Sequence, residues 1–79
     1  MPLAEIKVIE GVFSDSEKRA MIERVTDAMI SVEGEGLRDK TLVILEEIKS
    51  NDWSVGGQSV STEAAKDLRE AESTSTRTA

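Results

Sequence analysis

Residues 41–48 read TLVILEEI, and they predict a strand whose place in the chain decides the fold. Apolar side chains run almost without interruption through Leu45, which is typical of a strand buried on both faces. The stretch before it, SDSEKRAMIERVTDAMISV over residues 14–32, opens on a capping box formed by Ser14 and Glu17. Apolar residues then follow helical spacing, so we expect a helix from about Asp15 to Ser31 or Val32.

A second strand is predicted at the start of the chain, where residues 2–9 read PLAEIKVI and alternate between two faces. A strand, a helix of about 17 residues and another strand form a β-α-β unit, whose two strands pair in parallel. Gly56-Gly57 predicts a short hairpin, and a last short helix is expected from about Thr62. The predicted class is therefore α+β, with one domain over 1–72 and a disordered polar tail over 73–79.

The composition excludes several classes of function. The net charge is −6 and the ten basic residues are scattered, which argues against nucleic acid as a partner. No apolar run approaches the ~20 residues that span a bilayer, and no secretory signal precedes one, so a cytoplasmic location is expected. The chain has no cysteine and no histidine, so we expect no metal site and no cofactor. Its shortness favours self-association.

Pro2, the single proline, follows Met1 directly. As a strand opener it is well suited, because proline fixes φ and lacks a backbone donor. If Met1 is removed, the same residue presents a free secondary amine. An α-amino group titrates near ~7.7–8.0, which makes it a natural base in a chain without histidine. Judged from the residues alone, the role of Pro2 as the first residue of a strand is favoured over its role as a base.

The chain resembles the 4-oxalocrotonate tautomerase family over roughly residues 2–60. The resemblance rests on PLAEIKVIEG at the start, on SDSEK opening the helix, and on TLVILEEIKSNDWSVGG. It implies an isomerase, a β-α-β protomer assembled as a homohexamer, with a dimer as the smaller alternative. It also implies that Met1 is removed and that the Pro2 amine is the catalytic general base. The implied substrate is a small enol or 2-keto acid.

The resemblance also assigns the residues that bind substrate. Trp53 matches the family's aromatic residue before the Gly-Gly turn, and with Ile9 it would form the apolar wall beside the proline. The family's two carboxylate-binding arginines are replaced, one by the Val12–Phe13 pair and the other by Leu42. Phe13, Leu42 and Trp53 therefore suggest an apolar pocket for an aryl enol or a monoacid.

Two basic residues, Arg38 and Lys40, lie just before the second strand. One interpretation is that they replace the missing arginines from a neighbouring subunit. The other is that they are ordinary solvated loop residues, and the residues alone favour this second interpretation. Two other functions stay open: a proline-dependent hydratase or dehalogenase, and a non-catalytic oligomeric scaffold of the same fold. The first usually needs a carboxylate-holding arginine, and the second follows if Met1 is retained.

Overall fold

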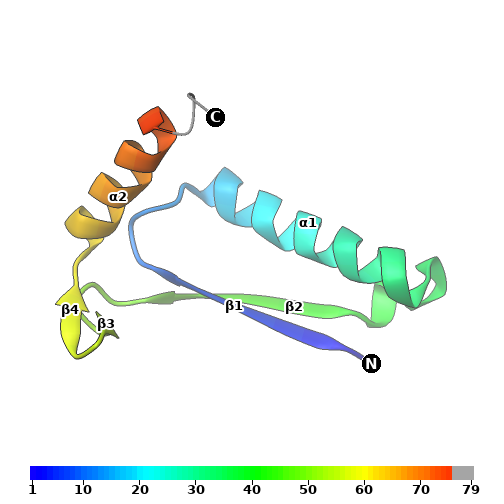
Figure 1. Ribbon diagram of the computed structural model, residues 1–79. Helices are drawn as coiled ribbons and strands as arrows, with labels where there is room; N and C mark the ends of the chain where they lie inside the picture. Colours follow the sequence, from blue (N-terminus) through cyan, green and yellow to red (C-terminus); the bar gives the residue numbers. More distant parts are fainter. Residues whose placement is uncertain (76–79) are drawn as a thin grey trace. The chain divides into compact units, whose positions relative to one another are not determined.

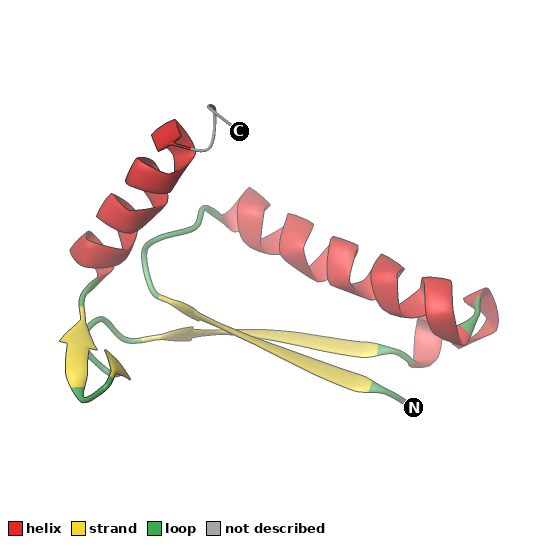
Figure 2. Ribbon diagram, in the orientation of Figure 1, coloured by secondary structure: helices red, strands yellow, loops and turns green. Residues whose placement is uncertain are grey.

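The computed structural model describes the backbone of residues 1–75 and the side chains of residues 1–71 (Figure 1). Its helices and strands follow the predicted order and add a 3₁₀ helix, η1, before the second long strand (Figure 2). The elements are β1 (Leu3–Ile9), α1 (Asp15–Glu33), η1 (Glu35–Lys40), β2 (Leu42–Ile48), β3 (Trp53–Val55), β4 (Gln58–Val60) and α2 (Thr62–Ser75). The predicted α+β class is confirmed.

β1 and β2 form a two-stranded parallel sheet joined by α1. Near the start of the pair, the amide N–H of Leu42 donates to the carbonyl of Pro2 at 3.0 Å. Near its end, the N–H of Glu10 donates to the carbonyl of Ile48 at 2.8 Å. The two bonds advance in the same direction along both strands, as parallel pairing requires. The β-α-β unit predicted from residues 2–48 is therefore present.

α1 begins at the predicted capping box. The Ser14 hydroxyl accepts a hydrogen bond from the N–H of Glu17 at 3.1 Å, and the Glu17 carboxylate accepts from the N–H of Ser14 at 2.9 Å. Met21, Ile22, Val25 and Met29 are half-buried along one face, and Ile30 is buried. The helix ends at Gly34, whose φ of 106° is a backbone conformation that favours glycine.

The burial of the two long strands is one-sided. In β1, Ala4, Ile6 and Val8 are covered while Leu3, Glu5 and Lys7 are exposed, as the alternation predicts. In β2, however, Leu42 and Ile44 are 54% and 50% exposed. The prediction that this strand is buried on both faces is wrong for a single chain. The single helix between the two strands covers one face of the sheet and leaves the other face exposed.

The short hairpin is confirmed at the predicted glycines. β3 and β4 pair antiparallel, with Trp53 opposite Val60 and Val55 opposite Gln58. Gly56 and Gly57 have φ values of 58° and 83°, which suit the two central residues of a tight hairpin turn.

The chain divides into two compact units. The first holds Met1–Val8 and Phe13–Glu46, and the second holds Ile9–Val12 and the chain from Glu47 onwards. α2 continues to Ser75, beyond the predicted boundary at residue 72, and residues 76–79 of the predicted tail lie outside the described residues. The single domain over 1–72 stays a prediction. Within the described residues, no helix is long and apolar enough to cross a membrane.

Candidate functional site

Pro2 lies at the start of β1, in the first unit, and is half-buried. Its carbonyl is held by the N–H of Leu42, so the backbone at this residue is fixed by the neighbouring strand. Beside it is a hollow of about 430 Å³ whose other lining residues come from the last turns of α1: Ala28, Met29, Val32 and Glu33. Four of the five lining residues are apolar. The proline therefore faces largely apolar surroundings.

Glu33 is the one charged residue of this hollow, and sequence reasoning missed it. Its Oε2 lies 2.9 Å from the Thr41 hydroxyl oxygen, whose single hydrogen is shared between Oε2 and the carbonyl of Leu37 at 2.8 Å. The signal was present, because Glu33 follows Met29 at helical spacing of four on a face that the sequence marks as apolar. A held carboxylate at the edge of the hollow places an acceptor close to Pro2.

Leu42 is the predicted pocket residue that the structure brings next to Pro2, through the backbone bond between them. Its side chain is 54% exposed on the sheet face. Phe13 is half-buried in the segment before α1, in the same unit.

Arg38 lies in η1 and lines a different hollow, of about 480 Å³, together with Glu23, Arg24, Thr26 and Asp27. Its guanidinium donates to Glu35 at 2.5 Å and to Asp27 at 3.0 Å. These two hydrogen bonds, the Glu35 bond first, raise the pKa of Arg38 above its usual value. In the described chain this cation therefore binds its own carboxylates at a hollow that Pro2 does not line, and its role toward a substrate stays a prediction.

The two remaining predicted residues lie in the second unit. Ile9, at the end of β1, is buried with 7% of its surface exposed. Trp53 opens β3 and is 36% exposed. A partly exposed indole is compatible with an apolar wall, and the role of both residues stays a prediction.

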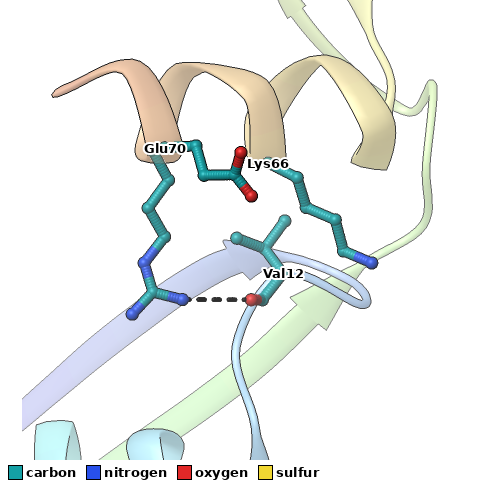
Figure 3. Close-up of a pocket in the computed structure, with 4 residues that line it drawn as sticks. Val12, Lys66 and Glu70 are labelled. Atoms are coloured by element: carbon teal, nitrogen blue, oxygen red, sulfur yellow. Dashed lines mark hydrogen bonds between the residues drawn. The ribbon is translucent and has the colours of Figure 1, made fainter. Parts of the chain in front are cut away.

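A further hollow of about 340 Å³ lies in the second unit, and sequence reasoning missed it entirely (Figure 3). It is lined by Val12 of the segment after β1 and by Lys66, Arg69 and Glu70 of α2. The Arg69 guanidinium donates to the carbonyl of Val12 at 3.3 Å. The available signal was a basic pair three residues apart in a helix that follows the hairpin.

Within the described part of the chain, no three or more carboxylate, thiol or imidazole residues gather in a way that could hold a metal ion.

Residues 2–63 match a family model described as tautomerase enzyme. Over 61 residues the chain is 38% identical to a probable tautomerase of Halalkalibacterium halodurans, covering 77% of this chain and 97% of the relative. It is 33% identical to a 2-hydroxymuconate tautomerase of Bacillus subtilis, covering 77% of this chain and 95% of that one. A solved 4-oxalocrotonate tautomerase homologue of the tomaymycin biosynthetic pathway superposes with a TM-score of 0.67 at 31% identity, covering 89% of this chain and 95% of the homologue.

Proposed function

The chain belongs to the tautomerase family and is an isomerase, and we propose that it is a cofactor-independent tautomerase whose general base is the amine of Pro2. The amine becomes available when Met1 is removed. The proposed substrate is the enol or keto form of a small 2-keto acid, or an aryl enol. The tautomerase family model matches the chain from residue 2, which supports a role for this end of the chain.

The apolar hollow beside Pro2 is the observation that carries the proposal. Ala28, Met29 and Val32 line the hollow with hydrocarbon, which disfavours the charged ammonium form of an amine, whereas the Glu33 carboxylate at its edge acts in the opposite direction. A neutral amine near neutral pH is the form that accepts a proton. The ring and the Pro2–Leu42 backbone bond hold that nitrogen at a fixed point at the strand end, so little reorganisation is needed.

The proposed reaction moves one proton and conserves all atoms. The neutral Pro2 nitrogen takes the proton of the enol hydroxyl, which leaves an enolate and a protonated amine. The same amine then returns the proton to the substrate carbon, and the carbonyl forms as the carbon–carbon double bond is lost. The base ends neutral, as it began, so no oxidant, reductant or second substrate is required.

The apolar character of the other predicted residues suggests which substrates fit. Phe13 and Leu42 stand where the resemblance implies arginines that would hold a dicarboxylate, and Trp53 and Ile9 are proposed to form the apolar wall. We propose an aryl enol or a monoacid over a dicarboxylate. The carboxylate at Glu33 reinforces this choice, since a second negative charge close to Pro2 would be repelled.

We also propose a cytoplasmic homo-oligomer, a hexamer with a dimer as the alternative. The sheet face opposite α1 presents Leu3, Leu42 and Ile44, which are 52%, 54% and 50% exposed. Large apolar side chains exposed in this way on a small chain favour burial against another copy.

The decisive experiment combines intact-protein mass spectrometry with ketonisation of the enol of phenylpyruvate, followed by its ultraviolet absorbance. Wild-type protein is expected to lack Met1 and to turn over. Two variants test the base: Pro2→Ala, and a chain with one large residue inserted between Met1 and Pro2, which keeps the ring but makes its nitrogen an amide. Both are expected to lose about 100-fold or more in kcat/KM, the usual share of a general base. Undiminished turnover in the insertion variant contradicts the proposal.

A further inference from the structure

The C-terminal end of α1 brings negative charge to the hollow at Pro2, and the proposed reaction gives that charge no role. Glu33, the last residue of the helix, lines this hollow, and both residues lie in the first unit. We propose that Glu33 is a positioning residue whose carboxylate is the counter-ion of the protonated Pro2 amine. The proposal deepens the proposed function and rests on it for the presence of the free amine.

A short chain of contacts holds the Glu33 carboxylate at the end of the sheet where Pro2 lies. Its Oε2 lies 2.9 Å from the Thr41 hydroxyl oxygen. Thr41 directly precedes Leu42, whose N–H donates to the Pro2 carbonyl at 3.0 Å. Glu33 and Pro2 are therefore joined to adjacent residues at the start of β2. Figure 1 shows the end of α1 and the start of β1 at the same end of the β-α-β unit.

The backbone of α1 adds to the negative charge at this end. Carbonyl groups at the end of a helix carry partial negative charge, which favours a nearby cation. The last turn, residues 30–33, reads ISVE and contains no lysine or arginine. The N–H of Gly34 donates to the carbonyl of Ile30 at 2.8 Å and satisfies one of these groups. A protonated amine at the hollow would supply the cation that the helix itself lacks.

The charged side chains of the two long strands lie on the other face of the sheet. Successive residues of a strand point to opposite faces, so Pro2 shares the face of Ala4, which is covered, and Glu5 and Lys7 point away from it. The Lys7 nitrogen lies 2.6 Å from Glu46 and 3.7 Å from Glu5. These three charges bind one another away from the hollow.

The charged residues of η1 are also accounted for. Arg38 binds Glu35 and Asp27 at the second hollow of the first unit. Asp39 and Lys40 are adjacent, opposite in charge and exposed. The lining of the proline hollow contains none of these five residues.

Two opposing influences then act on the Pro2 amine. The hydrocarbon lining lowers the pKa of an amine, and a carboxylate beside it raises that pKa. A general base works best when its pKa is near the working pH, because it must be deprotonated and still basic enough to take a proton. Glu33 therefore keeps the amine from becoming too weak a base, and it stabilises the ammonium that forms when the enol proton is taken.

The test titrates the Pro2 nitrogen itself. The chain has one proline, so labelling with ¹⁵N-proline gives a single resonance, whose shift follows the protonation of the amine in full-length protein. Glu33→Gln keeps an acceptor for the Thr41 hydroxyl and removes only the charge. It is expected to lower the pKa of the amine by about half to one unit, since Glu33 is half-buried. Glu33→Asp, which keeps the charge on a shorter side chain, is expected to fall between Glu33→Gln and the wild type.

The matched control is Glu23→Gln, which removes the same charge from an exposed position of the same helix. Glu23 precedes Glu33 by ten residues, about 15 Å along the helix axis, and lines a different hollow. It is expected to leave the titration of Pro2 in place. Equal pKa values of the amine in wild type and Glu33→Gln, or an equal shift in Glu23→Gln, overturn the proposal.

The titration needs no turnover, so it separates the role of Glu33 from that of the proposed base. If Pro2→Ala keeps full activity while the pKa of the wild-type amine still depends on Glu33, the base is wrong and the counter-ion stands. If the Pro2 variants lose activity while Glu33→Gln leaves the pKa unchanged, the base stands and the assignment of Glu33 fails. Retention of Met1, seen by mass, leaves no amine at Pro2 and overturns both.

The pH profile of turnover gives the second readout. With the enol of phenylpyruvate as substrate, the rising limb of kcat/KM in Glu33→Gln is expected to move to lower pH by the amount of the ¹⁵N shift. A merely structural role of Glu33 would lower activity without moving the limb. A limb that stays in place in Glu33→Gln therefore overturns the proposal.

Discussion

The ammonium nitrogen of Lys7 in β1 lies 2.6 Å from Oε1 of Glu46 in β2, so a charged pair joins the two parallel strands on their exposed face. Glu5 adds a second, longer contact to the same nitrogen at 3.7 Å. The hydrogen bond to Glu46 is the main cause that raises the pKa of Lys7 above its usual 10.5. This relationship makes the pairing of the strands sensitive to strongly alkaline pH.

Replacing Lys7 by Gln is expected to lower stability at pH 8 and to matter progressively less above pH 10.5. The folded-state pKa of Lys7 exceeds the unfolded value, so its stabilisation is complete below the unfolded pKa and is lost as pH rises through the folded pKa. Melting of wild type and Lys7→Gln can be followed by Trp53 fluorescence, because the chain has no tyrosine to ionise in alkali. A difference in Tm that stays constant to pH 12 contradicts the expectation.

The N-terminal cap of α1 gives a second prediction. Ser14→Ala removes the acceptor for the N–H of Glu17 and is expected to cost about 1 kcal/mol of unfolding free energy. Ser14→Asp keeps a side-chain acceptor at the same place and is expected to retain most of the stability. Urea unfolding of both variants beside the wild type measures the difference. Equal losses in Ala and Asp variants would show that the hydroxyl does not act as a cap.

Elements that depend on neighbouring residues could be predicted from the sequence. The capping box fixes where α1 begins because Ser14 and Glu17 satisfy each other's backbone groups locally. Gly56 and Gly57 tolerate the positive φ that the hairpin turn needs. A helix of this length between two apolar strands is the usual crossover between parallel strands, so parallel pairing could be predicted. In the first two cases the cause lies within a few residues, and in the third it lies in the order and length of the elements.

The rest depends on contacts between distant residues, for which a single sequence carries no pattern. Arg38 pairs with Asp27 across eleven positions, and Arg69 reaches Val12 across fifty-seven. Glu33 reaches the Pro2 hollow because α1 extends to that residue and returns the chain to the start of β1. The exposure of Leu42 could not be predicted from its neighbours in the sequence either. An apolar run indicates that both faces of a strand are to be buried, but it does not indicate whether the same chain or another copy buries the second face.

The exposed sheet face gives a prediction about assembly. Ile44→Lys places a charge on a side chain that is half exposed in the single chain, so the protomer is expected to fold. Burial of that charge against another copy is costly, so the oligomer is expected to dissociate. Ala64→Lys adds the same charge at an exposed position of α2 and serves as the control. Native mass spectrometry and sedimentation report the mass, and an unchanged oligomer in Ile44→Lys excludes this face as the interface.

The Pro2 hollow gives a prediction about the pH dependence of catalysis. Val32 lines the hollow and is 90% exposed, so Val32→Asp adds a carboxylate there without disturbing packing. A negative charge beside an amine favours its protonated form, which raises the pKa of the amine. The rising limb of kcat/KM against pH, which reports the free base, is therefore expected to move upward by about half to one unit.

The matched control for this shift is Ser31→Asp, which adds the same charge on the preceding residue of α1 but outside the lining of the hollow. It is expected to leave the limb nearly in place. High salt screens exposed charges over about 3 Å at 1 M, so the displacement in Val32→Asp is expected to shrink there. A limb that moves equally in both variants means that the titrating base does not lie at this hollow, and Pro2 then loses its role.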